Sequence, residues 1–112
     1  MNGKISTFIN ACSHRGAILT PLKRGNAKVL TCRFHGWAYD MGGRCIKIKN
    51  QEGGFPQADF SRDRFDLRPI AKVDSYRGFV FGSLAQDVPS LKDHLGAAAR
   101  WIDLLDAQAP DG

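Results

Sequence analysis

Short runs of apolar, β-branched and aromatic residues recur along residues 4–84 of the chain. They occupy 4–9, 28–32, 37–40, 45–49, 67–76 and 78–84, and Gly-bearing segments separate most of them. Runs of this length and composition are typical of β-strands. Segments 41–43 and 76–78 predict hairpin turns, whereas 50–65 predicts a long irregular loop. The pattern therefore predicts a mainly β fold of small antiparallel sheets, and we find no internal repeat.

The pattern changes to a helical one near the end of the chain. Apolar residues at 91, 95, 98, 102 and 105 recur at helical spacing. Ser90, with Asp93 three positions later, is typical of a helix start that caps its own backbone. We therefore expect a β domain over 1–88 and one amphipathic C-terminal helix over 89–112. Trp101 and His94 on this helix are interpreted as a packing residue and a surface residue.

Length and composition limit the possible classes of protein. With 112 residues the chain can form one small domain, and small domains often need a metal or another cross-link for stability. Its 43% hydrophobic and 24% charged residues are ordinary for a soluble protein, and no apolar run approaches the roughly 20 residues of a membrane span. The N-terminal residues lack a signal-peptide pattern. We therefore expect a cytoplasmic protein that does not enter a membrane.

Two short segments carry the candidate chemistry. Cys12 and His14 lie in the first, Cys32 and His35 in the second, with 17 residues between His14 and Cys32. Two thiolates and two imidazoles could complete a tetrahedral zinc site, but the common zinc spacing keeps the cysteines together and the histidines together. One of each on two facing loops suits a two-iron cluster, in which the thiolates hold one iron and the imidazoles the other. The spacing predicts electron transfer, with a zinc-binding module as the less favoured alternative.

The third cysteine, Cys45, does not belong to either segment. A further ligand would break the two-plus-two symmetry, and free cysteines are commonly buried, so we interpret Cys45 as a buried strand residue. Three cysteines, two of them candidate ligands, also disfavour a disulfide framework. We therefore expect hydrogen bonds and packing alone to hold the two loops.

The residues around the candidate ligands identify a family. They read N-A-C-S-H-R-G over 10–16 and C-R-F-H-G-W-A-Y over 32–39. This closely resembles the Rieske motif of aromatic-ring-hydroxylating dioxygenase large (alpha) subunits. The resemblance continues through 53–56, 73–81 and 89–91, so it covers most of the chain.

The resemblance implies a Rieske [2Fe–2S] domain with two cluster-binding loops. Cys12 and Cys32 are then the ligands of one iron, and His14 and His35 the ligands of the other through neutral imidazoles. Neutral ligands raise the reduction potential relative to all-cysteine clusters, to between about −150 and +300 mV. High-potential relatives place a hydroxyl residue shortly after the second histidine, where this chain has Gly36 and Trp37, so we expect the lower end of that span.

The resemblance also implies partners. In relatives, a ferredoxin or flavin reductase delivers single electrons to the cluster. The cluster passes them to a mononuclear iron, held by two histidines and a carboxylate in a catalytic domain, where O2 is added to an aromatic ring. This chain has no match to that iron site, so its status as an enzyme by itself stays open. A stand-alone Rieske ferredoxin serving a separate oxygenase is the alternative, and the dioxygenase-like stretch from 73 to 91 disfavours it.

Charge is unevenly distributed. Residues 1–50 carry a net charge of +8 and residues 51–112 a net charge of −3. A basic surface can bind nucleic acid, but no base-stacking or helix-turn-helix pattern accompanies this one, so we expect no nucleic-acid partner. Two interpretations of the basic residues stay open. They form either a plain solvated surface or a docking face for an acidic electron donor.

The two ends suggest a truncated domain. Asn2-Gly3 is a hairpin signal preceded only by Met1, so we expect leading strands to be missing. Residues 89–112 are expected to begin the linker to an absent catalytic domain. Because an unpaired sheet edge and an uncovered helix favour association, we also expect an oligomer.

Overall fold

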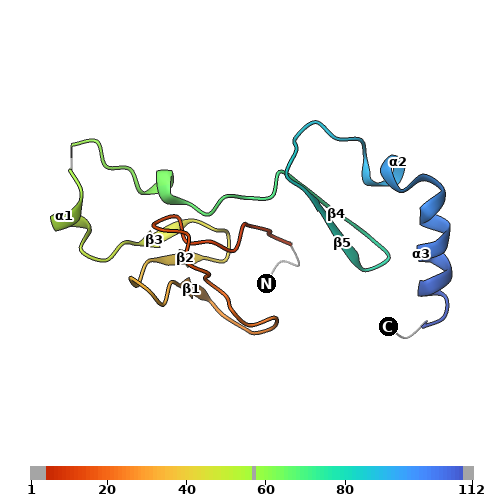
Figure 1. The fold of residues 1–112 in the computed structure, drawn as a ribbon, viewed down its shortest axis with the longest axis horizontal. Coiled ribbons are helices and arrows are strands. Elements are labelled where there is room, and N and C mark those ends of the chain that lie inside the picture. Colours follow the sequence, from red (N-terminus) through yellow and green to blue (C-terminus); the bar gives the residue numbers. More distant parts are fainter. Residues whose placement is uncertain (1–4, 57, 110–112) are drawn as a thin grey trace. The chain divides into compact units, whose positions relative to one another are not determined.

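The computed structural model describes residues 5–56 and 58–109 (Figure 1). They fall into two compact units, Met1–Pro69 and Ile70–Gly112, and each is described by itself. Both candidate ligand segments lie in the first unit. The predicted boundary between residues 88 and 89 separates the β domain from the C-terminal helical segment and is a different division from that into compact units. It stays a prediction.

The first unit contains a three-stranded antiparallel sheet. Its strands are β1 (Val29–Thr31), β2 (Ala38–Asp40) and β3 (Cys45–Lys47), hydrogen-bonded in the order β1-β2-β3. The register between β2 and β3 shifts at Ala38 and Tyr39. A bulge of this kind bends a strand and redirects its side chains, here directly after the second ligand segment.

The turn between β2 and β3 is held by the side chain of Asp40. Its Oδ1 accepts hydrogen bonds from the backbone N–H of Gly42 at 2.8 Å and of Arg44 at 3.0 Å. Gly43 has a φ of 83°, in the left-handed region that glycine adopts without strain. The predicted hairpin turn at 41–43 is therefore confirmed.

The segment from 50 to 65 is more ordered than an irregular loop. It contains a short helix, α1 (Gln51–Gly54), and a 3₁₀ turn over Arg62–Phe65. Arg62 joins them, because its guanidinium donates to Gln51 Oε1 at 2.8 Å and to the carbonyl of Ile46 at 3.1 Å. This arrangement brings Phe55 and Phe65 against Trp37, with ring centroids 6.1 and 5.3 Å away.

The core of the first unit is small and contains all three cysteines. Tyr39 is completely buried and Cys32 is 2% exposed. The buried cluster consists of Cys12, Leu19, Cys32, Trp37, Tyr39, Cys45, Ile48 and Leu67. Both candidate thiolate ligands therefore belong to the core, and the site cannot be formed independently of the fold.

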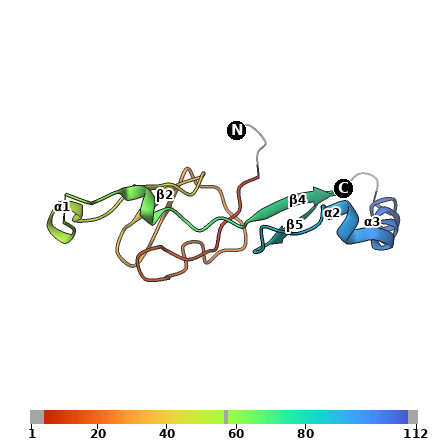
Figure 2. The same ribbon diagram turned by 90° about the horizontal axis from the view of Figure 1, so that it is seen from above.

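The second unit begins with an antiparallel hairpin (Figure 2). Strand β4 (Lys72–Tyr76) pairs with β5 (Phe79–Ser83) in continuous register. Arg77 and Gly78 form the turn with φ values of 49° and 80°, as a type I′ hairpin turn requires. The predicted turn at 76–78 is confirmed.

The helical segment follows the hairpin. It consists of α2 (Leu91–Leu95), a 3₁₀ turn over Gly96–Ala98, and α3 (Ala99–Asp106). The Ser90 hydroxyl accepts the Asp93 N–H at 3.1 Å, which confirms the predicted cap. Gly96, with φ 47° and ψ −126°, leaves the helical conformation and divides the predicted helix in two.

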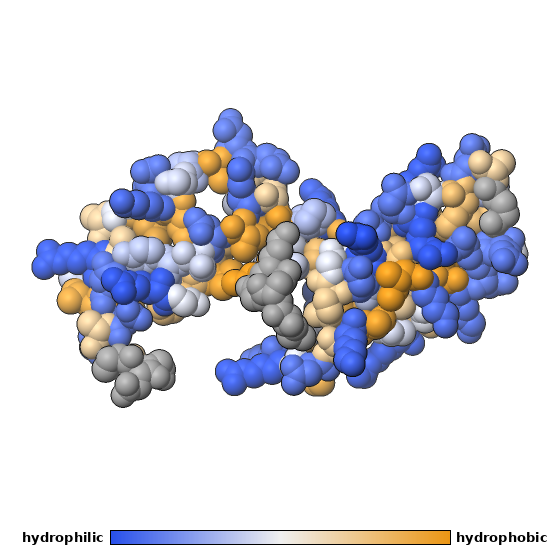
Figure 3. Space-filling view, turned by 180° about the vertical axis from the view of Figure 1, so that it is seen from behind, coloured by the Kyte–Doolittle hydropathy of each residue, from blue (hydrophilic) through white to orange (hydrophobic). Residues whose placement is uncertain are grey.

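Side-chain contacts fix α3 to the hairpin. Asp103 accepts hydrogen bonds from the Tyr76 hydroxyl at 3.0 Å and from Arg77 Nε at 2.9 Å. Trp101 is 70% exposed, so its interpretation as a packing residue is wrong, and Leu104 is also exposed. Figure 3 shows such apolar surface on both units. In the described part of the chain, no helix has the length and apolar character to cross a membrane.

The predicted fold class is confirmed, with one strand fewer than expected. The runs at 28–32, 37–40, 45–49, 67–76 and 78–84 each contain an observed strand. The run at 4–9 forms only a single bridge, between Phe8 and Pro69. The predicted Asn2-Gly3 turn and Lys4 lie outside the described residues.

Replacing Gly43 by alanine should destabilise the first unit strongly. An added Cβ would stand 2.5 Å from the Phe8 ring at a φ of 83°. A side chain in the left-handed region costs about 1–2 kcal/mol before any clash. We expect Gly43→Ala to lower the free energy of unfolding by about 2 kcal/mol or more, measured by denaturant titration. Gly25→Ala, where a Cβ would meet nothing within 4 Å, is the control; equal effects of the two would contradict this account.

Candidate metal centre

The two candidate ligand segments are tight loops that close in the same way. In each, the cysteine N–H donates to the carbonyl five residues later, at 2.8 Å for Cys12 and 2.7 Å for Cys32. A glycine N–H four residues later donates back to the cysteine carbonyl, at 2.8 Å from Gly16 and 2.9 Å from Gly36. The loops are thus backbone copies of one another, a repeat that the sequence alone does not reveal.

Glycine ends both loops because of its backbone conformation. Gly16 and Gly36 have φ values of 73° and 70°. An added Cβ would meet nothing within 4 Å at Gly16 and only the Lys49 side chain at 4.0 Å at Gly36. The left-handed conformation rather than crowding therefore favours glycine here.

The two candidate imidazoles face each other. His14 Nδ1 and His35 Nδ1 lie 3.1 Å apart, and their ring planes are inclined at 78°. Two nitrogens at this separation can both lie within about 2.1 Å of one metal ion. The pKa of His14 lies below its ordinary value because of partial desolvation, followed by the charges of His35 and Arg15. A lowered pKa favours the neutral imidazole, the form that binds metal.

The two candidate thiols form a second, buried pair. Cys12 and Cys32 are 3% and 2% exposed. Burial by itself would raise the pKa of Cys32, but hydrogen bonds to its sulfur from the backbone of Phe34 and His35 and from the Cys12 thiol outweigh burial and lower that pKa. Because the thiolate is the metal-binding form of cysteine, these hydrogen bonds prepare the sulfur for a metal.

The four side chains therefore lie as two like pairs. Among residues 5–56 and 58–109, no three His, Cys, Asp or Glu side chains converge as a site for a single metal ion requires. One imidazole pair and one thiol pair match the donor set of a two-iron cluster with one pair on each iron. The residues thus fit the cofactor that the spacing predicts.

A tyrosine contacts the thiol pair. The Tyr39 oxygen accepts the Ser13 N–H at 3.1 Å and lies 3.2 Å from Cys12 Sγ. Because the Ser13 N–H approaches the oxygen, the hydroxyl proton is free to point at the sulfur. Burial, together with the neighbouring Cys12, raises the pKa of Tyr39, so the hydroxyl stays protonated near neutral pH. Tyr39 is thus placed to donate to a Cys12 thiolate.

Aromatic rings enclose the imidazole pair on one side. The indole of Trp37 stacks on His14, with centroids 4.7 Å apart and planes 17° apart. Phe34 lies against His35 at 4.1 Å but is 67% exposed. A hollow of about 420 Å³, lined in part by Lys49 and Phe55, opens over both histidines. Trp37 therefore covers one face of His14, while His14 remains exposed and His35 is half-buried.

Cys45 shares the buried core with the candidate thiol ligands but belongs to neither ligand pair. Its thiol is 5% exposed and donates to the carbonyl of Lys47 at 3.9 Å. Burial raises the pKa of the Cys45 thiol. The charge of Arg62 lowers that pKa and the charge of Asp66 raises it. A raised pKa keeps Cys45 as a thiol and disfavours metal binding. Its placement agrees with its interpretation as a buried strand residue.

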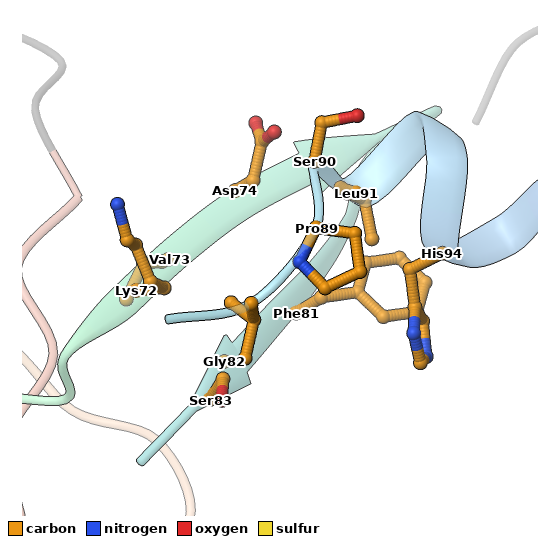
Figure 4. Close-up of a pocket in the computed structure, with 11 residues that line it drawn as sticks. Lys72, Val73, Asp74, Phe81, Gly82, Ser83, Pro89, Ser90, Leu91 and His94 are labelled. Atoms are coloured by element: carbon orange, nitrogen blue, oxygen red, sulfur yellow. The ribbon is translucent and has the colours of Figure 1, made fainter. Parts of the chain in front are cut away.

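His94 lies in the second unit. It is exposed and lines a pocket of about 470 Å³ between the hairpin and the start of α2 (Figure 4). Phe81, Pro89 and Leu91 form much of its apolar wall. In the described chain, His94 belongs to no group that could hold a metal.

Comparison with known proteins decides the family. The model of the Rieske [2Fe–2S] domain family matches residues 1–76. The chain belongs to this family. A Rieske domain carries a [2Fe–2S] cluster of the Rieske type, so the predicted cofactor is confirmed. The assignment of individual ligands stays a prediction.

Relatives of this Rieske domain are dioxygenase subunits. It is 42% identical over 112 residues to the toluate 1,2-dioxygenase subunit alpha of Pseudomonas putida, covering 99% of this chain and 25% of that protein. It is 43% identical over 111 residues to the anthranilate 1,2-dioxygenase large subunit of Acinetobacter baylyi, covering 98% and 23%. The naphthalene 1,2-dioxygenase of a Rhodococcus species, solved with indole, superposes with a TM-score of 0.80 at 31% identity, covering 92% and 23%. The Rieske domain described here thus spans about a quarter of the length of its curated relatives.

Sequence reasoning missed Tyr39. A hydroxyl residue was sought at positions 36 and 37, which hold Gly36 and Trp37. In the structure, the hydroxyl near Cys12 comes from Tyr39, two residues after Trp37. The sequence offered one signal, which was the position of Tyr39 close behind the second ligand segment in a run of strand-forming residues. A buried tyrosine usually has a partner for its hydroxyl, and the nearest candidate chemistry was the cluster.

Replacing Tyr39 by phenylalanine should lower the reduction potential of the cluster. A hydrogen bond to the Cys12 sulfur favours the more negative, reduced state, and phenylalanine keeps the ring but removes the donor. We expect a decrease on the order of 60 mV, which corresponds to about a tenfold change in a one-electron equilibrium. Protein-film voltammetry measures it. Tyr76→Phe in the second unit is the matched control, and a potential unchanged in both variants would contradict the role of Tyr39.

Proposed function

We propose that this Rieske domain transfers single electrons within an aromatic-ring-hydroxylating dioxygenase, as part of its alpha subunit. The observation that carries the proposal is the pairing of two buried thiols with two accessible imidazoles on twin loops. Such a cluster accepts and releases one electron at a time. The chain supplies the ligands, covers one face of His14 with Trp37, and leaves both imidazoles accessible to partners.

The proposed ligand set is Cys12 and Cys32 for one iron and His14 and His35 for the other. Supporting it are the 3.1 Å separation of the two Nδ1 atoms and the lowered pKa of Cys32. With Nδ1 on iron, each ring leaves Nε2 free to exchange a proton. Since an added electron makes the cluster more negative, those nitrogens should hold protons more tightly in the reduced state.

The proposed partners are a ferredoxin or flavin reductase as donor and an oxygenase catalytic domain or subunit as acceptor. Residues 1–69 carry a net charge of +7, and Arg15 and Arg33 adjoin the candidate ligands His14 and Cys32. This charge favours a donor with an acidic docking surface. The names of relatives suggest aromatic acids and hydrocarbons as final substrates, in a catabolic oxidation.

The alternative of a stand-alone Rieske ferredoxin is less well supported. The family model ends at residue 76, but the likeness to the toluate and anthranilate dioxygenase subunits continues over 99% and 98% of the chain. It therefore includes the helical segment. The division into a Rieske domain over 1–88 and the start of a linker over 89–112 is part of the proposal. A cytoplasmic location and self-association are further parts of the proposal.

Removing single ligands tests the proposed site. Cys32→Ser and His35→Ala should abolish the visible absorbance and the low-temperature EPR signal of the Rieske cluster, because each removes one iron ligand. Cys45→Ser should retain both signals, since the Cys45 thiol donates to the Lys47 carbonyl and belongs to neither candidate ligand pair. Loss of the signals in the Cys45 variant would refute the ligand set. A colourless wild-type protein containing one zinc ion would refute the function itself.

Salt tests the proposed donor. Electron delivery by an acidic ferredoxin should slow by about tenfold or more as ionic strength rises, because steering by exposed charges is screened beyond about 8 Å at physiological salt. Stopped-flow reduction of the oxidised cluster measures the rate. Arg33→Gln should weaken the salt dependence, whereas Arg100→Gln in the second unit should not. A rate that is independent of salt would show that the basic residues are a solvated surface and do not dock the donor.

A further inference from the structure

The second cluster loop is closed by a β-ladder. Its two arms are β1 and β2, and their register pairs Thr31 with Ala38 and Leu30 with Tyr39. Cys32 therefore projects from a loop whose base is held by strand pairing. Tyr39, the completely buried residue of the second arm, is fixed in the core by the same ladder.

The first cluster loop lacks this support. Around Cys12, the described residues form no strand on either arm. The backbone instead bends sharply at Asn10, because the Ala11 N–H donates to the Ile9 carbonyl at 2.7 Å in a γ-turn. The backbone of Asn10, which precedes Cys12 as Leu30 precedes Cys32, is therefore not paired as Leu30 is.

The side chain of Asn10 makes the missing connection. Its Oδ1 accepts the backbone N–H of Thr20 at 3.0 Å and of Leu19 at 3.2 Å. Its Nδ2 donates to the Thr20 carbonyl at 2.9 Å. A primary amide has the same acceptor and donor as a peptide group, so Asn10 pairs with Thr20 as a strand residue would.

The residues that Asn10 contacts occupy positions equivalent to the paired residues of β2 in the second loop. Leu19 follows Cys12 at the same distance in sequence as Tyr39 follows Cys32, and both are buried in the core, at 5% and 0% exposure. The hydrogen bond from Leu19 to Asn10 therefore anchors the chain where it leaves the first loop. His14 lies within that loop. No disulfide links the loops, since all three cysteines are free.

We propose that Asn10 is a positioning residue that closes the first cluster loop by substituting its side-chain amide for a β-ladder pair. The proposal rests on the proposed cluster function. Asn10 itself is exposed, so water can satisfy the separated groups when it is replaced. Its loss should therefore loosen the loop and the ligands Cys12 and His14 without unfolding the core.

The test uses the full chain with its cluster and two substitutions. Asn10→Ala removes all three hydrogen bonds, and Asn10→Asp keeps the size and the acceptor but replaces the donor to Thr20. Loss of an outer partner of a metal site typically costs about 10–100-fold in affinity. We expect both variants to lose the cluster to a chelator about tenfold faster than wild type, followed by the decay of visible absorbance, and to show shifted EPR g values.

Two controls separate loop closure from general stability. Asn26→Ala removes an exposed asparagine of the same unit and should behave as wild type. Ile48 belongs to the same buried cluster but lies outside both ligand loops, so Ile48→Ala should lower the melting temperature and change the g values less than the Asn10 variants do. Asn10 variants with wild-type chelation rates and g values would overturn the proposal, as would effects that only match the stability loss of Ile48→Ala.

The wild-type protein provides a test that does not depend on a variant folding. Hydrogen-exchange mass spectrometry of the cluster-bound chain should show slow exchange at the Leu19 and Thr20 amides, at least about tenfold slower than the exposed 22–26 segment. Exchange of the two amides at unprotected rates would overturn the role of Asn10 even if neither variant could be purified. A wild-type chain that never shows a Rieske spectrum would instead defeat the proposed function.

Discussion

The first unit builds its hydrophobic core in part from the residues of its candidate metal centre. A unit this small has too little apolar material for a core and a separate site. Cys12, Cys32 and Tyr39 accordingly serve both purposes, and each is at most 3% exposed. Packing then fixes ligand positions before any metal binds, while the cluster in turn supplies cross-links that the apolar contacts cannot. Folding and cofactor binding are therefore expected to be thermodynamically coupled.

Local chemistry made the turns predictable and indicated the candidate ligands. The candidate ligands lie two or three residues apart within each loop, so the sequence itself keeps them together, and the turns at 41–43 and 76–78 need residues that tolerate positive φ. The N-cap of helix α2 was predictable for the same reason, since Ser90 and Asp93 interact within one turn of helix.

Features that depend on distant contacts were not predictable. The Tyr39 hydroxyl meets Cys12 across 27 positions of sequence, and no local pattern encodes that contact. The run at 4–9 has strand-like composition, yet Phe8 finds only one bridge partner, at Pro69. Helical spacing from 91 to 105 was correct on either side of Gly96, but spacing does not report the backbone conformation of one glycine.

One residue near the end of the first unit links several parts of it. The carbonyl of Asp66 accepts the Ser13 hydroxyl at 3.0 Å, and its carboxylate accepts the Cys45 N–H at 2.7 Å. Ser13 stands between Cys12 and His14, and Pro69 ends the unit three residues after Asp66. Asp66 thus connects the first candidate ligand loop directly to strand β3. A displacement of either one would be transmitted to the other through the hydrogen bonds of this single residue.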